Sequence, residues 1–131
     1  MVIMNEYGEN KMVEIANKIP KLSDCEEMIM KVLWDAEEDL DLIQVTERVG
    51  VRYGKEWRLQ TVATFMTRLK NKGWIDIYKV GRYSHYRPMV EINVYREMKI
   101  LEIVDLFAKL SKEDCIDAVR RLVDNVIEKI K

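Results

Sequence analysis

The chain has 131 residues, which is enough for one small domain with an appendage and a modest buried core. Its 22 Lys/Arg and 23 Asp/Glu nearly cancel to a net charge of −1, yet residues 51–88 hold 9 Lys/Arg against 2 Asp/Glu. The two cysteines form no C-x-x-C pair and no apolar run is long enough to span a bilayer, which argues against a disulfide framework and a membrane protein and predicts a cytoplasmic one.

Three regions are expected along the chain: an N-terminal extension (1–20), a first domain (21–90) and a helical region (91–131). In the extension, Met12, Ile15 and Ile19 fit one face of a short helix that Pro20 would end. An untethered tail fits these residues as well, so both interpretations stay open.

A capping box, in which Ser23 is followed by Glu26, predicts the start of the first helix of the domain. This helix is expected over residues 24–37 and a second one over residues 42–51. The acidic run of residues 37–41 is expected to be a solvated turn, because its spacing does not match a calcium loop. The residues expected to face the core are Met28, Ile29, Val32, Leu33, Leu42, Val45 and Val49.

The segment from Trp57 to Trp74 predicts a two-faced helix that Gly73 ends. Short hydrogen-bonding side chains and a cation, with no acidic residue, occupy its outer face. Such a face suits base edges and phosphates in a groove of DNA, whereas a merely solvated face usually mixes Glu with Lys. The inward residues are Leu59, Val62, Phe65, Met66 and Leu69, and the outward ones are Gln60, Thr61, Thr64, Thr67, Arg68 and Asn71.

Two alternating runs around Val80-Gly81-Arg82 predict a β-hairpin that Pro88 ends. Its tip and one face are expected to be positive through Lys79, Arg82, His85 and Arg87. His85 is the only histidine and has no cysteine nearby, so a surface or phosphate-facing imidazole is expected and no metal or cofactor is predicted.

Two amphipathic helices are predicted after Glu91, over about residues 92–110 and from an N-cap at Ser111 onward. Their apolar surface exceeds what so small a domain can hide, which predicts pairing with a second copy of the chain. Packing on the first helix is the alternative. The residues expected at the dimer interface are Leu101, Val104, Phe107, Val119, Leu122 and Val126.

The pattern W-x-x-x-T-V-x-T-x-x-x-R-L-x-x-K-G, from Trp57 to Gly73, resembles the BlaI/MecI/CopY family of bacterial repressors. The stretch IPKLSDCEEMIMKVLWD is similar to that family's first helix, and GRYSHYRP (81–88) is similar to its wing. The resemblance implies a mainly α fold with a small β-hairpin wing, that is, a winged helix-turn-helix plus a C-terminal helical dimerisation region.

The resemblance to this family further implies a homodimeric repressor that binds a two-fold symmetric operator in double-stranded DNA. Base contacts are then expected from Gln60, Thr61 and Thr64. Phosphate contacts are expected from Arg58, Thr67, Arg68, Lys79, Arg82, His85 and Arg87.

Three departures limit what is carried over. Ala63 stands where some members have a base-facing arginine, so the operator sequence does not transfer. Cys115 alone does not match the cysteine cluster of the copper-sensing branch. The β-lactam-responsive members imply a sensor protease as a partner, but Leu106-Phe107 differs from the Asn-Phe bond commonly cleaved in them, which leaves the inducing signal open.

Catalysis is not expected, because one histidine and five scattered glycines form no nucleophile–base motif or phosphate-binding loop. The alternative to DNA binding is a winged-helix module whose basic face binds an acidic protein. Gln60, Thr61 and Thr64 favour DNA, since such side chains are useful chiefly against base edges.

Overall fold

The computed structural model describes residues 19–106 and 111–130. Contacts divide the described residues into one unit that ends at Tyr95 and another that begins at Arg96. We call residues 19–95 the winged-helix unit. The helix predicted around Met12 and the interface residue Phe107 both lie outside the described residues.

Helix α2 (Asp24–Asp35) begins at the predicted capping box. Ser23 Oγ accepts from the Glu26 N–H at 3.3 Å, and Glu26 Oε1 accepts from the Ser23 N–H at 2.8 Å. The helix ends two residues earlier than predicted, because Ala36 already has extended backbone angles. Met30 lies in the core, whereas Met28 is only half-buried.

In the acidic segment before α3 (Leu42–Tyr53), the predicted solvated turn holds for the exposed Glu37 and Glu38 but is wrong for Asp39 and Asp41. Leu40–Asp41 forms a short strand, β1, which pairs antiparallel with strand β3 (Tyr83–Pro88) and sets Leu40 opposite Tyr86. Asp41 also caps α3, since its Oδ1 accepts from the Gln44 N–H at 2.9 Å. This pairing fixes the start of α3 to the sheet.

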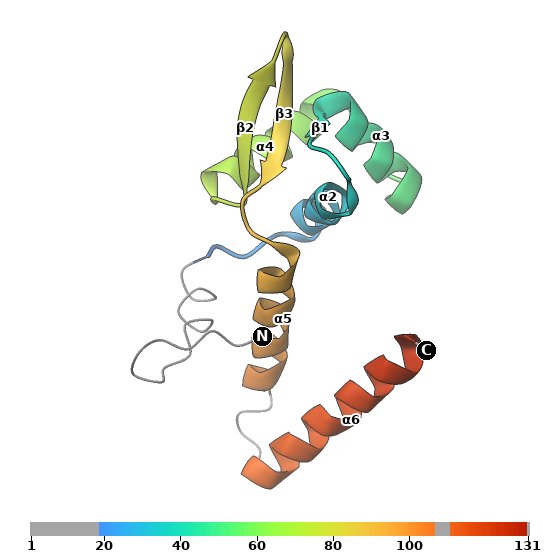
Figure 1. Cartoon of the computed structure of the whole chain (residues 1–131), viewed down its shortest axis with the longest axis vertical. Coiled ribbons are helices and arrows are strands. Elements are labelled where there is room, and N and C mark those ends of the chain that lie inside the picture. Colours follow the sequence, from blue (N-terminus) through green and yellow to red (C-terminus); the bar gives the residue numbers. More distant parts are fainter. Residues whose placement is uncertain (1–18, 107–110, 131) are drawn as a thin grey trace. The chain divides into compact units, whose positions relative to one another are not determined.

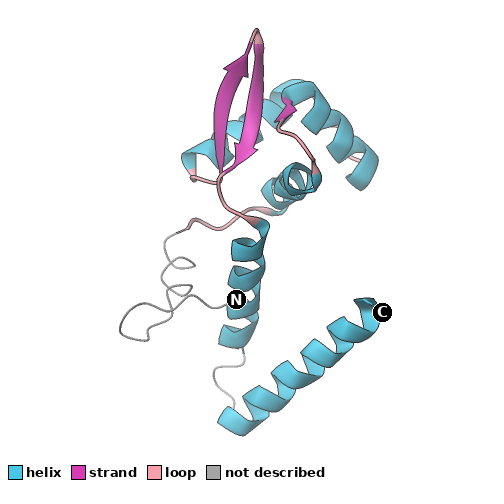
Figure 2. Ribbon diagram, in the orientation of Figure 1, coloured by secondary structure: helices cyan, strands magenta, loops and turns pink. Residues whose placement is uncertain are grey.

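The predicted hairpin is confirmed and joins a sheet with the strand order β1-β3-β2 (Figure 2). Strands β2 (Ile75–Val80) and β3 (Tyr83–Pro88) are connected through Gly81, whose φ of 64° lies in the left-handed region that glycine favours. Figure 1 shows the hairpin extending past helix α3 and helix α4 (Leu59–Asn71), as a wing does.

Helix α4 (Leu59–Asn71) has the predicted inward stripe, with Val62, Met66 and Leu69 fully buried. Phe65 is half-buried against Trp57, with ring centroids 5.1 Å apart, so Trp57 packs at the entry of the helix. The inward prediction for Leu59 is wrong: this side chain is 46% exposed. Leu59 is the first residue of the helix and faces a hollow beside the wing instead of the core.

An aromatic cluster closes the base of the winged-helix unit. Trp34 lies with its ring centroid 6.4 Å from that of Trp74 and 5.1 Å from that of Tyr95. Both indoles are hydrogen-bonded, Trp34 Nε1 to the Val90 carbonyl at 2.9 Å and Trp74 Nε1 to the Pro20 carbonyl at 2.8 Å. The cluster therefore joins α2, the sheet and the two ends of the unit.

Helix α5 spans Ile92–Leu106 and helix α6 spans Lys112–Ile130. The N-cap predicted at Ser111 is confirmed, because its Oγ accepts from the Asp114 N–H at 3.1 Å. In α6 the predicted interface residues Leu122 and Val126 are 39% and 52% exposed. Within residues 19–106 and 111–130, no helix has the length and apolar character that crossing a membrane requires.

Candidate nucleic-acid interface

The outer face of α4 presents the side chains predicted to contact bases. Gln60, Thr61 and Thr64 are all exposed, while the opposite stripe of the same helix is buried. The two-faced helix predicted from the spacing is therefore present, and its polar face is accessible to a large ligand.

Two threonine hydroxyls on this face are held by the helix itself. Thr64 Oγ1 donates to the Gln60 carbonyl at 3.0 Å, and Thr67 Oγ1 donates to the Ala63 carbonyl at 3.1 Å. Bonds of this kind, to the carbonyl four residues earlier, restrict the rotamer of each threonine. The outer face of α4 is thus partly ordered before any ligand binds.

Several cations of this surface form no ion pair with a described residue. The side chains of Arg58, Lys79 and Arg82 are exposed, and within residues 19–106 the structure gives them no ion pair or hydrogen bond. The Arg68 guanidinium is exposed and lies 5.8 Å from the centroid of the Phe65 ring. These uncompensated charges make the start of α4 and the wing tip attractive to a polyanion.

The expectation that one face of the wing is positive is wrong. Side chains alternate along a strand, and the register pairs Lys79 with Ser84, so Lys79 lies on the face opposite to His85 and Arg87. The register also sets Asp76 opposite Arg87. Positive charge without a partner is therefore concentrated at the wing tip. The face of the wing that holds Asp76, His85 and Arg87 carries both positive and negative charge.

Arg87 belongs to a small network around Asp39. Its Nε lies 3.3 Å from Asp39 Oδ2, and its guanidinium lies 4.6 Å from the centroid of the Tyr78 ring. The Tyr78 hydroxyl donates to the same carboxylate oxygen at 2.6 Å, a bond that raises the pKa of Tyr78. Hydrogen bonds with Tyr78 and Asp39 also raise the pKa of Arg87. The ring of His85 stacks on that of Tyr78, with centroids 5.7 Å apart, so His85 packs against the network to which Arg87 belongs. The phosphate contacts of both residues stay predictions.

The far end of α4 is anchored by a pair that the sequence did not reveal. Lys72 Nζ lies 2.6 Å from Glu26 Oε1 and donates to the Lys21 carbonyl at 2.9 Å. Burial raises the pKa of Glu26, but the bonds from Lys72 and Ser23 outweigh it and hold this pKa below its usual value. Lys72, one of the residues of the family pattern, thus fastens the helix to α2 inside the protein.

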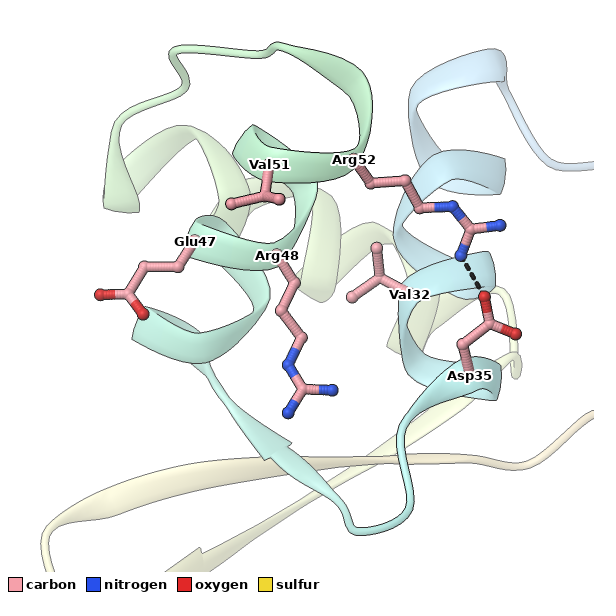
Figure 3. A pocket seen from close by; sticks show the side chains of 6 residues that line it. All are labelled: Val32, Asp35, Glu47, Arg48, Val51 and Arg52. Atoms are coloured by element: carbon pink, nitrogen blue, oxygen red, sulfur yellow. Dashed lines mark hydrogen bonds and ion pairs between the residues drawn. The ribbon is translucent and has the colours of Figure 1, made fainter.

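A separate hollow of about 350 Å³ lies between α2 and α3 (Figure 3). Arg52 turns to Asp35 across it, and Val51 stands at its rim with a side chain that is 90% exposed. Its six lining residues include no hydroxyl, thiol or imidazole. The lining residues are Val32, Asp35, Glu47, Arg48, Val51 and Arg52.

Comparison with known proteins gives consistent matches. A family model described as "Penicillinase repressor" matches residues 22–129. The penicillinase repressor of Bacillus licheniformis is 30% identical over 90 residues, which make up 69% of this chain and 68% of that protein. The solution structure of the DNA-binding domain of the repressor BlaI matches with 30% identity and a TM-score of 0.50, over 59% of this chain and 90% of that one. A complex structure of RosR from H. salinarum, 17% identical with a TM-score of 0.52 over 88% of this chain and 98% of that one, shares the fold.

Proposed function

Because the chain belongs to the penicillinase repressor family and is a DNA-binding transcriptional repressor, we propose that it binds a two-fold symmetric operator as a homodimer in the cytoplasm. The observation that carries this proposal is the accessible polar face of α4 beside cations that have no acidic partner.

In this proposal α4 lies in the major groove. Gln60 suits adenine, since its amide can donate to N7 and accept from N6 of that base. Arg58 and Arg68 flank the polar face and suit phosphates, as does Arg82 at the wing tip. Phosphate contacts would fix the register of the protein on the duplex, and the side chains of α4 would select the sequence.

The homodimer is supported by the exposed apolar side chains of α6. Ile116, Val123 and Ile130 are 45%, 50% and 77% exposed, and with Val119 and Val126 they recur at alternating steps of three and four residues. That spacing is typical of helices that pair with other helices. A second copy of α6 would remove this stripe from water and present two winged-helix units to two half-sites.

The test is a gel shift with duplexes from upstream of the gene, in excess competitor DNA and over a series of salt concentrations. Specific binding should survive the competitor, and affinity should fall steeply with salt because bound phosphates release counterions. Light scattering of the complex should give two chains per duplex. If the chain binds no duplex even at low salt, the basic face serves an acidic protein partner instead.

We further propose that a sensor protease is the partner that releases the protein from DNA. Leu106, the last described residue of α5, is 80% exposed, which is the kind of accessibility that cleavage near it requires. Immunoblots of cells exposed to a β-lactam should then show a shortened chain when repression is lost. A full-length chain under derepression would point to release by a ligand.

A further inference from the structure

A second hollow, of about 300 Å³, lies between the starts of α3 and α4 and the wing. Its lining includes apolar side chains that are exposed to solvent. Ile43 and Leu59 are each 46% exposed, and Tyr83 is 51% exposed. Such side chains gain free energy when a partner covers them, and here they surround a concave site.

The hollow lies within the surface that faces the duplex under the proposed function. Leu59 is the first residue of α4 and stands between Arg58 and Gln60. Arg82 lines the same hollow from the wing tip, and the structure pairs neither arginine with another group among residues 19–106. The occupant should therefore present a small apolar group with negative charge around it.

Asp41 indicates that the hollow holds the edge of a base and not a phosphate. Asp41 is one of the residues that line the hollow, and its carboxylate accepts from the Gln44 N–H, so an anion inside the hollow would lie near a like charge. The edge of a base is uncharged, so this carboxylate would not repel it. Along the major groove, the one apolar group that a base pair presents is the C5-methyl of thymine, and phosphates lie on both sides of it.

We propose that Leu59 and Ile43 contact the C5-methyl of one thymine in each operator half-site, which makes Leu59 a specificity-determining residue. This inference rests on the proposed function, because it requires the start of α4 to enter the major groove. Burying one methyl group corresponds to about a fourfold gain in affinity.

The test begins with an operator selected from random duplexes. Each thymine is then replaced in turn by deoxyuridine, which lacks only the methyl group, and Kd is measured by fluorescence anisotropy. We expect one position in each half-site where the replacement weakens binding about fourfold. A 5-bromouracil base at that position should restore affinity, since bromine fills the volume of the methyl group.

Leu59→Ala should bind the thymine operator more weakly and lose less affinity than the wild type when deoxyuridine replaces that thymine. Ile43→Ala gives a second variant in the same hollow, so the test does not depend on the folding of one protein. Val51→Ala is the matched control, because Val51 is 90% exposed and lines a different hollow. Val51→Ala should lose as much affinity as the wild type when deoxyuridine replaces thymine.

Operator binding in which no thymine is sensitive to loss of its methyl group would overturn the inference and leave the proposed function intact. The same holds if the loss persists unchanged in Leu59→Ala and Ile43→Ala. If no duplex is selected at all, the proposed function fails and this inference fails with it.

Discussion

Replacing Lys72 by methionine removes an ammonium group that holds α4 to α2 and keeps most of the side-chain stem. The variant loses the 2.6 Å contact with Glu26 Oε1 and the 2.9 Å bond to the Lys21 carbonyl. Glu26 is only 1% exposed, and its Oε2 already has no hydrogen-bond partner. Lys72→Met therefore leaves a buried carboxylate whose remaining partner is the capping box.

Breaking a buried ion pair from one side costs about 3–5 kcal/mol. The Lys72 side chain is 31% exposed, so water screens part of its interaction and about 2–3 kcal/mol is expected in the free energy of unfolding. All three tryptophans, Trp34, Trp57 and Trp74, lie in the winged-helix unit. Urea unfolding followed by tryptophan fluorescence at pH 7 therefore reports on the unit that contains the pair.

The stability difference should also depend on pH. In the wild type the pKa of Glu26 lies below the usual 4.5, so the stability it contributes is present above pH 4.5 and is lost as pH falls through the folded pKa. Without Lys72 two influences that lower this pKa disappear, so the pKa of Glu26 rises in the variant. The difference between the two proteins should be largest at neutral pH and shrink in acid.

Lys70→Met is the matched control. Lys70 is on the same helix and is exposed, and its ammonium group forms no ion pair or hydrogen bond in the described part of the chain. Its replacement should change the free energy of unfolding by less than about 0.5 kcal/mol. If Lys72→Met were equally mild, or if its deficit grew as pH fell, the pair would not anchor α4.

Three further substitutions test the surface and the dimer. Arg68→Ala should weaken binding to all duplexes alike and reduce the salt slope by about 1 if it holds a phosphate; a loss confined to one sequence would contradict that role. Gln60→Ala should relax discrimination at one base pair by about 1–3 kcal/mol in a competition assay with operator variants, and an unchanged profile would remove Gln60 from the base-contacting set. Leu122→Asp should give monomers in light scattering and lower operator affinity, whereas a persistent dimer would place the interface elsewhere.

Local patterns were sufficient to predict the helices and the hairpin. The capping box of Ser23 and Glu26 operates over three residues, and Gly81 needs only its own turn to adopt a positive φ. The stripe of Val62, Met66 and Leu69 follows from helix geometry alone. Signals of this kind are complete within a few residues, so tertiary structure does not change them.

Contacts between distant segments could not be predicted in this way. Lys72 and Glu26 are 46 positions apart, and Arg87 and Asp39 are 48 apart. Strand β1 has only two residues, too few to show alternation, and exists because β3 offers it an edge. The acidic segment therefore looked solvated in the sequence although two of its carboxylates have structural partners.

The residues of the candidate site also divide into those that local patterns predict and those that only the three-dimensional fold reveals. Helix periodicity placed Gln60, Thr61 and Thr64 on the accessible face, because that requires only the angle between successive residues. The same angle assigned Leu59 to the core. Where the wing approaches the start of α4 depends on the whole sheet, so the hollow around Leu59 appears only in three dimensions.

The two threonine hydroxyls of α4 carry a consequence for the bases this helix can distinguish. Each hydroxyl has a single hydrogen, and Thr64 and Thr67 direct theirs to carbonyls of their own helix. What they present outward is lone pairs and a methyl group, which can accept from the amino groups of adenine or cytosine. They offer no donor to N7 or O6 of guanine, so any guanine on this face must be recognised by the hydroxyl of Thr61, by the amide of Gln60 or by a cation.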